Sequence, residues 1–153
     1  MVIKRRDGDH LLLFEATMEG VEAYLLNTAM KYYRQSGKVA IRRANCSRTP
    51  EFMEKLYQFV EETTGRSYKQ DWIQLVRAAY NANEEEDLSS LFCSQLIAAA
   101  YQRLDILYPD VHSNNFVPSD FASDMHGELT GARMSDVRKV HSVSKKKAIV
   151  LKE

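Results

Sequence analysis

Residues 91–102 read Leu91-Phe92-Cys93-Ser94-Gln95-Leu96-Ile97-Ala98-Ala99-Ala100-Tyr101-Gln102, and this stretch predicts the central helix of the fold. Its apolar stripe is expected to pack inward with the sulfur on it: Cys93, Leu96, Ile97, Ala100, Tyr101 and Leu104. Either Ser89 or Ser90 is expected to cap the helix, so that Cys93 falls in the first turn. Orphan N–H groups and the positive end of the helix dipole favour a thiolate at such a position.

Two interpretations of Cys93 remain open on helix position alone. A thiol at a helix start that faces the protein interior has the geometry required of a nucleophilic cysteine. Free cysteine is also among the most buried residue types, and it often packs as a small hydrophobic side chain.

Composition sets the broad class of the protein. The chain has 153 residues, 44% hydrophobic and 27% charged, as expected for one globular domain. Its formal net charge is zero, so nothing global indicates nucleic acid or an anionic membrane as partner. Two cysteines, no visible secretory leader and no membrane-length apolar run predict a cytoplasmic protein without disulfides. The cysteine and histidine spacings predict no metal site, and we expect no cofactor.

Three strands are expected at the start of the chain. They are Met1–Arg5, His10–Ala16 and residues 20–25, with Asp7-Gly8 forming a type I′ turn in the first hairpin. This turn pairs Lys4 with Leu11 and Met1 with Phe14.

The remaining pattern adds helices first and short strands last. Thr49 is expected to cap a helix with Pro50 at its first position and Gly65 past its end, burying Phe52, Leu56, Phe59 and Val60. Other expected elements are a helix capped by Asn27 and ended by Gly37, a strand over 38–44, a helix over 71–82, a polar loop over 114–121 and short strands at 137–140 and 148–151. The pattern predicts an α+β fold, a small antiparallel sheet packed on the helix that bears the cysteine.

Three motifs in this order resemble one family. They are Leu11-Leu12-Leu13-Phe14-Glu15-Ala16 with Gly20-Val21, then Phe92-Cys93-Ser94-Gln95-Leu96 with Ala98-Ala99-Tyr101, then Val117-Pro118-Ser119-Asp120-Phe121. Together they resemble the circularly permuted papain-like cysteine hydrolases of the NlpC superfamily, in its YiiX-like branch. The resemblance implies a permuted papain-like domain over 1–140, followed by a C-terminal tail or late strand over 141–153.

The resemblance also implies a chemistry. The family cleaves or transfers acyl groups at amide, ester or thioester bonds through a cysteine thioester. Carried over, Cys93 matches the nucleophile and Glu15 matches the residue that orients the catalytic histidine. The implied substrate is a small-molecule, peptide or lipid acyl compound, and the Cys93 backbone N–H would meet the oxyanion.

The family histidine has no counterpart among these residues. The resemblance places it just upstream of Met1, and the hairpin register leaves the same strand position beside Glu15 unoccupied. His10 lies five residues from Glu15, roughly 16 Å along a strand and on the opposite face. His112, His126 and His141 lie beyond the Cys93 helix. The alternatives are a shortened chain, a base supplied from elsewhere, and a non-catalytic binding module that keeps the fold.

Other polar and aromatic residues have simpler interpretations. Asp120 is expected to cap a local turn, and Cys46 to be inert. Arg42-Arg43 is expected to form a solvated strand face. Aromatic residues that could line an acyl pocket are more simply core positions: Tyr24, Tyr80 and Tyr101.

Overall fold

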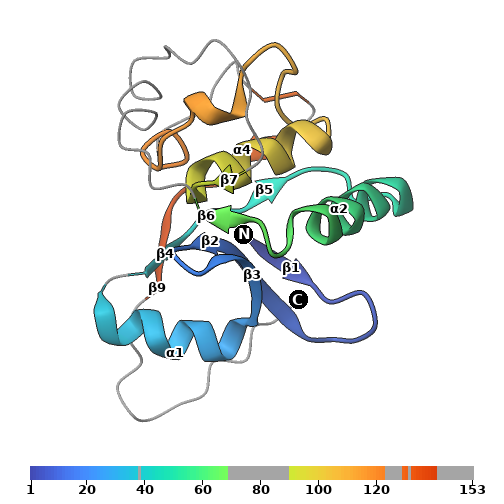
Figure 1. The fold of residues 1–153 in the computed structure, drawn as a ribbon. Helices are drawn as coiled ribbons and strands as arrows, with labels where there is room; N and C mark the ends of the chain where they lie inside the picture. Colours follow the sequence, from blue (N-terminus) through green and yellow to red (C-terminus); the bar gives the residue numbers. More distant parts are fainter. Residues whose placement is uncertain (38, 69–89, 123–128, 131, 141–153) are drawn as a thin grey trace.

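The fold is α+β, as the sequence predicts, and Figure 1 shows its arrangement in a computed structural model that describes residues 1–37, 39–68, 90–122, 129–130 and 132–140. Within these ranges the helices are α1 (Leu26–Ser36), α2 (Pro50–Thr63), α4 (Cys93–Arg103) and the 3-10 helix η1 (Ser113–Asn115). The strands are β1 (Val2–Lys4), β2 (Leu11–Thr17), β3 (Gly20–Leu25), β4 (Val39–Ile41), β5 (Ala44–Asn45), β6 (Ser67–Tyr68), β7 (Ser90–Leu91), β8 (Arg133–Met134) and β9 (Arg138–Val140). The helix expected over 71–82 and the strand expected over 148–151 lie outside the described residues.

The N-terminal sheet has the order β1-β2-β3, with antiparallel pairing throughout. The predicted register is confirmed, because Lys4 pairs with Leu11, and Met1 and Phe14 exchange backbone hydrogen bonds of 2.7 and 2.8 Å. The predicted type I′ turn is wrong, since neither Asp7 nor Gly8 has a positive φ. A longer loop joins the strands instead, closed by the Arg5 N–H donating to the His10 carbonyl at 2.9 Å.

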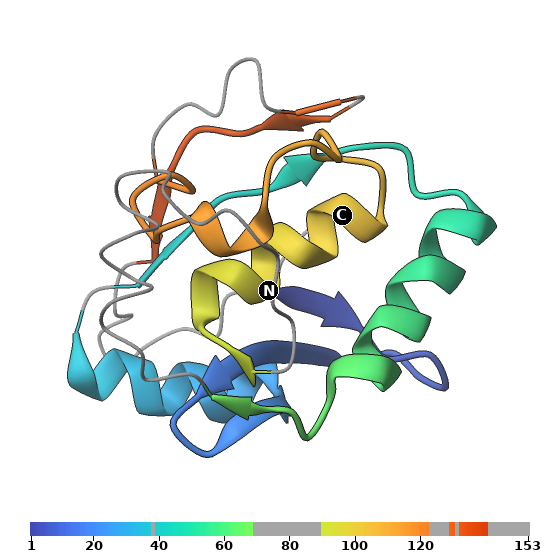
Figure 2. The same cartoon turned by 45° about the horizontal axis from the view of Figure 1, so that its top comes forward.

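The two faces of this sheet meet different helices. Side chains alternate along a strand, so Phe14 and Ala16 share one face of β2 and Glu15 lies on the other. Phe14 and Ala16 are buried in one core with residues of α2 and α4, whereas α1 packs on the opposite side of the sheet. Both ribbon views show the sheet between α4 and α1 (Figures 1 and 2).

Helix α4 is the most buried α-helix in the described part of the chain. Leu96, Ala98 and Ala100 have no exposed surface, and the helix packs against β2, α2 and η1. A fully buried Leu or Phe side chain contributes about 1.5–3 kcal/mol to folding. The expected serine cap is corrected: Phe92 is the N-cap without a side-chain hydrogen bond, Ser90 lies in β7, and Ser89 lies outside the described residues.

Local signals place the other helices with mixed success. Thr49 caps α2 as predicted, accepting a hydrogen bond from the Phe52 N–H at 3.2 Å, with Pro50 at the first position. The Asn27 cap is wrong, because α1 begins at Leu26 after the N-cap Leu25. Gly37 ends α1 as predicted.

The remaining short strands form two-stranded sheets, separate from the N-terminal sheet. The strand expected over 38–44 is split into β4 and β5, which pair with the late strands β9 and β8 respectively. β6 and β7 form a parallel pair, and β6 directly follows Arg66, whose carbonyl accepts a 2.9 Å hydrogen bond from the Val21 N–H of β3. No helix in the described ranges is long and apolar enough to cross a membrane.

The polar loop expected over 114–121 is corrected in its first part. Ser113, Asn114 and Asn115 form η1 and are buried against α4. Polar composition suggested an exposed loop, but a tight 3-10 turn that packs on a helix removes these side chains from water.

Gly20 provides a test of the β3–β6 contact. Its φ is +119°, and a Cβ built there would lie 2.9 Å from the Arg66 carbonyl oxygen. We expect Gly20→Ala to lower the free energy of unfolding by about 2–3 kcal/mol, because it adds backbone strain to a steric clash. Urea denaturation measures the change.

Gly8→Ala is the matched control, because Gly8 has no positive φ and a Cβ there meets nothing within 4 Å. It should leave stability unchanged or raise it by up to about 1 kcal/mol. Equal losses in the two variants would contradict this description of Gly20.

Candidate functional site

Cys93 is the first residue of α4, which confirms its predicted place at a helix start. The Leu96 N–H closes the first turn by donating to the Phe92 carbonyl at 3.0 Å. The side chain does not pack inward as the apolar stripe predicted, because Cys93 is exposed. At the first position the helix has no preceding turn to cover a side chain, so the sulfur is accessible to solvent and to a substrate.

Glu15 lies in β2 directly opposite Glu22 of β3. It is half-buried on the α1 side of the sheet, and the Tyr33 hydroxyl of α1 donates to its Oε2 at 2.7 Å. Burial, the hydrogen bond to Glu15 and the Glu15 charge together raise the pKa of Tyr33 to about 12. Tyr33 therefore stays protonated and donates to the carboxylate across the physiological range.

The Met1 amino group connects the two candidate residues electrostatically. It is held at the sheet by its 2.7 Å hydrogen bond to the Phe14 carbonyl. Burial lowers the pKa of this amino group to about 6, and the charges of Glu15 and Cys93 oppose that shift. Both candidate residues thus lie within electrostatic range of one group at the start of β1.

The structure brings Cys93 and Glu15 to this common neighbour from opposite sides of the sheet. α4, which begins at Cys93, covers the face of Phe14, and Glu15 points toward α1. A single base that served both residues would have to lie near the start of β1. The family resemblance also predicts that the Cys93 sulfur lies near Glu15, and this proximity stays a prediction.

The histidines of the described residues lie elsewhere. His10 is exposed beside the hairpin loop, and His112 precedes η1. His126 and His141 lie outside the described residues. Among the residues that the structure covers, no three His, Cys, Asp or Glu side chains form a group that could hold a metal ion.

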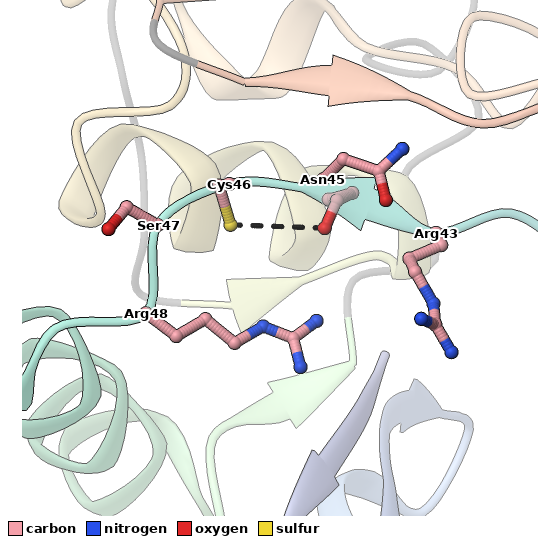
Figure 3. Close-up of a pocket in the computed structure, with 6 residues that line it drawn as sticks. Arg43, Asn45, Cys46, Ser47 and Arg48 are labelled. Carbon is pink, nitrogen blue, oxygen red and sulfur yellow. Dashed lines mark hydrogen bonds between the residues drawn. The ribbon is translucent and has the colours of Figure 1, made fainter. Parts of the chain in front are cut away.

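An open hollow of about 460 Å³ lies along β5 and the residues that follow it (Figure 3). Its lining runs over Arg43, Ala44, Asn45, Cys46, Ser47 and Arg48. The Cys46 sulfur lies 3.9 Å from the Ala44 carbonyl oxygen and is half-buried against the core. The sequence did not predict this hollow. No sequence motif indicates that Arg43 and Arg48, at the two ends of the segment, extend to the same side.

Arg42 corrects the expected solvated face. It is half-buried, and its guanidinium donates to the Ser135 and Phe121 carbonyls, both at 2.9 Å. Arg43 is exposed as expected. Both arginines lie in the two-residue connection between β4 and β5, and only Arg42 turns toward the 121 and 135 segments.

Two further expectations are confirmed. Asp120 accepts a 2.7 Å hydrogen bond from the Val117 N–H and so closes a local turn. Tyr101 is a core residue, with its hydroxyl 3.9 Å from the Met134 sulfur and its ring edge-on to Phe121. Tyr24 is half-buried on the Glu15 face of the sheet, and Tyr80 lies outside the described residues.

No protein-family model matches the chain, and neither a curated protein nor a solved structure matches it. Function is therefore inferred from the residues and their geometry.

The Tyr33–Glu15 contact can be tested by titration. We expect Glu15→Gln to lower the pKa of Tyr33 from about 12 toward its ordinary 10.0, because the charge is lost while the partial burial stays. Since the folded-state pKa is raised, the contact stabilises the fold fully below pH 10.0 and loses its effect as pH rises toward 12. Carbon-13 NMR of the Tyr33 ring, assigned with Tyr33→Phe, measures the titration.

Glu22→Gln is the control, because Glu22 lies opposite Glu15 but does not contribute to the Tyr33 shift. A Tyr33 titration that moves equally in both variants would show that the general negative charge of the sheet, rather than the Glu15 contact, raises the pKa.

Proposed function

We propose that the chain is the cysteine-bearing part of an acyl hydrolase or acyltransferase that forms a thioester on Cys93. The observation that carries the proposal is the exposed sulfur at the first residue of α4. A helix start offers backbone N–H groups and the positive end of a dipole, which stabilise a thiolate and the oxyanion that forms as it attacks a carbonyl.

The proposed reaction has two steps. The Cys93 sulfur attacks the acyl carbonyl, and the leaving alcohol, amine or thiol departs with a proton. Water or a second acceptor then attacks the thioester and regenerates the thiol. The bond can be an amide, an ester or a thioester, and the substrate a small molecule, a peptide or a lipid.

The order of motifs supports a permuted papain-like fold for residues 1–140, with Glu15 as the orienting residue. The register adds a physical argument: Phe14 pairs with Met1, so a residue preceding Met1 would pair with Glu15. A histidine two positions further upstream would lie diagonal to Glu15 on the same face, within side-chain reach.

A non-catalytic binding module is the second candidate. Glu15 already has a partner in Tyr33, and it points to the α1 side of the sheet rather than toward α4. In that case Glu15 serves the contact with Tyr33, no base activates Cys93, and the protein binds an acyl compound without cleaving it.

Thiol labelling tests the accessibility of Cys93. We expect iodoacetamide at neutral pH to modify Cys93 about three- to tenfold faster than Cys46, because Cys93 is exposed at a helix start and Cys46 is half-buried. Peptide mass mapping over time gives both rates. In urea the two rates should converge, and faster labelling of Cys46 in the folded protein would contradict the proposal.

Restoring a base tests the chemistry itself. We expect a His-Val-Gly segment placed before Met1 to raise turnover of activated acyl esters about 10²–10⁴-fold. An Ala-Val-Gly segment is the matched control, and Cys93→Ala should abolish the gain. Turnover of the unextended chain that depends on Cys93 would show that the base comes from elsewhere. An inactive but folded extended chain would favour the binding module.

A further inference from the structure

Two guanidiniums line the hollow along β5. Arg43 and Arg48 line it from the two ends of the segment, and Figure 3 shows both side chains extending to the same side. Neither guanidinium forms an ion pair with a carboxylate in the described part of the chain, whereas Arg5, Arg6 and Arg103 each do. Two positive charges lining one hollow raise the local positive potential, which attracts anions.

The backbone holds both arginines in place. The Arg43 N–H donates to the Ser135 hydroxyl at 2.9 Å, and the Ser135 N–H donates to the Arg43 carbonyl at 2.8 Å. Arg48 directly precedes Thr49, which caps α2. Because each arginine starts from a fixed backbone position, less conformational entropy is lost when the two guanidiniums engage one ligand.

The surroundings add further positive potential. The N-terminus of α2, a helix of 14 residues, follows Arg48 within two positions. The acidic residue of its first turn, Glu51, lies 3.7 Å from Lys55 of the same helix, and Lys55 also pairs with Asp105 at 2.6 Å. The other residues that line the hollow, Ala44, Asn45, Cys46 and Ser47, bring no carboxylate to it.

We propose that this hollow, the Arg43–Arg48 site, binds the phosphate of a phosphomonoester. A guanidinium presents a planar fork of N–H donors that matches phosphate oxygens, and two forks match a group of charge about −1.5 to −2 at neutral pH. A carboxylate carries a single charge and satisfies one fork. The site involves neither Cys93 nor Glu15, so it is independent of the proposed acyl chemistry.

Phosphate titration tests the site. Inorganic phosphate should cause saturable NMR shifts of the backbone amides of residues 43–48, and glycerol 3-phosphate should compete for the same residues. We expect Arg43→Gln and Arg48→Gln each to weaken binding about fivefold or more, because each removes one charged fork. The double variant should show no saturable shift. Arg34→Gln, which removes an exposed arginine of α1, should bind phosphate like the unmodified chain.

Four results would overturn the proposal. An absence of saturable shifts in residues 43–48 would exclude a phosphate site. An acetate affinity equal to that of phosphate would indicate a carboxylate site. An equal loss in Arg34→Gln would show a general charge effect. Binding to phosphatidic acid vesicles without binding to soluble phosphates would replace the small ligand with a membrane surface, whereas binding to both would place the phosphomonoester on a lipid or a soluble compound alike.

Discussion

The burial of α4 against one face of the β1–β2–β3 sheet is the contact on which the rest of the structure depends. Phe14 on β2 and Leu96 on α4 have no exposed surface, and both belong to a core that extends to Leu56 and Phe59 of α2. The run of alanines in α4 lets other elements approach the helix closely. With α4 packed in this position, its first residue, Cys93, lies at the surface.

The same burial explains the polarity of the opposite sheet face. When Phe14 and Ala16 enter the core, strand alternation sends Glu15 to the other side, and pairing in register places Glu22 beside it. Two carboxylates in this arrangement repel each other, and the Tyr33 hydroxyl supplies a donor to Glu15. Helix α1 therefore covers the sheet and also stabilises a charge that the fold of β2 places there.

Neighbouring arginines have opposite roles. Arg42 turns inward and donates to the Phe121 and Ser135 carbonyls, so its guanidinium links two segments that are distant in sequence to the connection between β4 and β5. Arg43 turns outward and joins Arg48 at the hollow. The first arginine acts in folding, and the second is available to a ligand. Two adjacent arginines in the connection between β4 and β5 thus have different surroundings.

The sequence by itself determined the elements whose signals are local. Turn residues and alternation set the pairing of Met1 with Phe14, Thr49 and Pro50 set the start of α2, and apolar spacing set the helix that begins at Cys93. The turn type at Asp7-Gly8 and the cap of α1 were not predicted correctly, because flanking strand and helix geometry overrides single-residue preferences. Tertiary structure alone decided that Cys93 is exposed and that Glu15 accepts a hydrogen bond from Tyr33. It also decided the burial of Ser113, Asn114 and Asn115, and that Arg43 and Arg48 line the same hollow. Each of these depends on which distant segment packs beside a residue, and no local pattern of residue types encodes that neighbour.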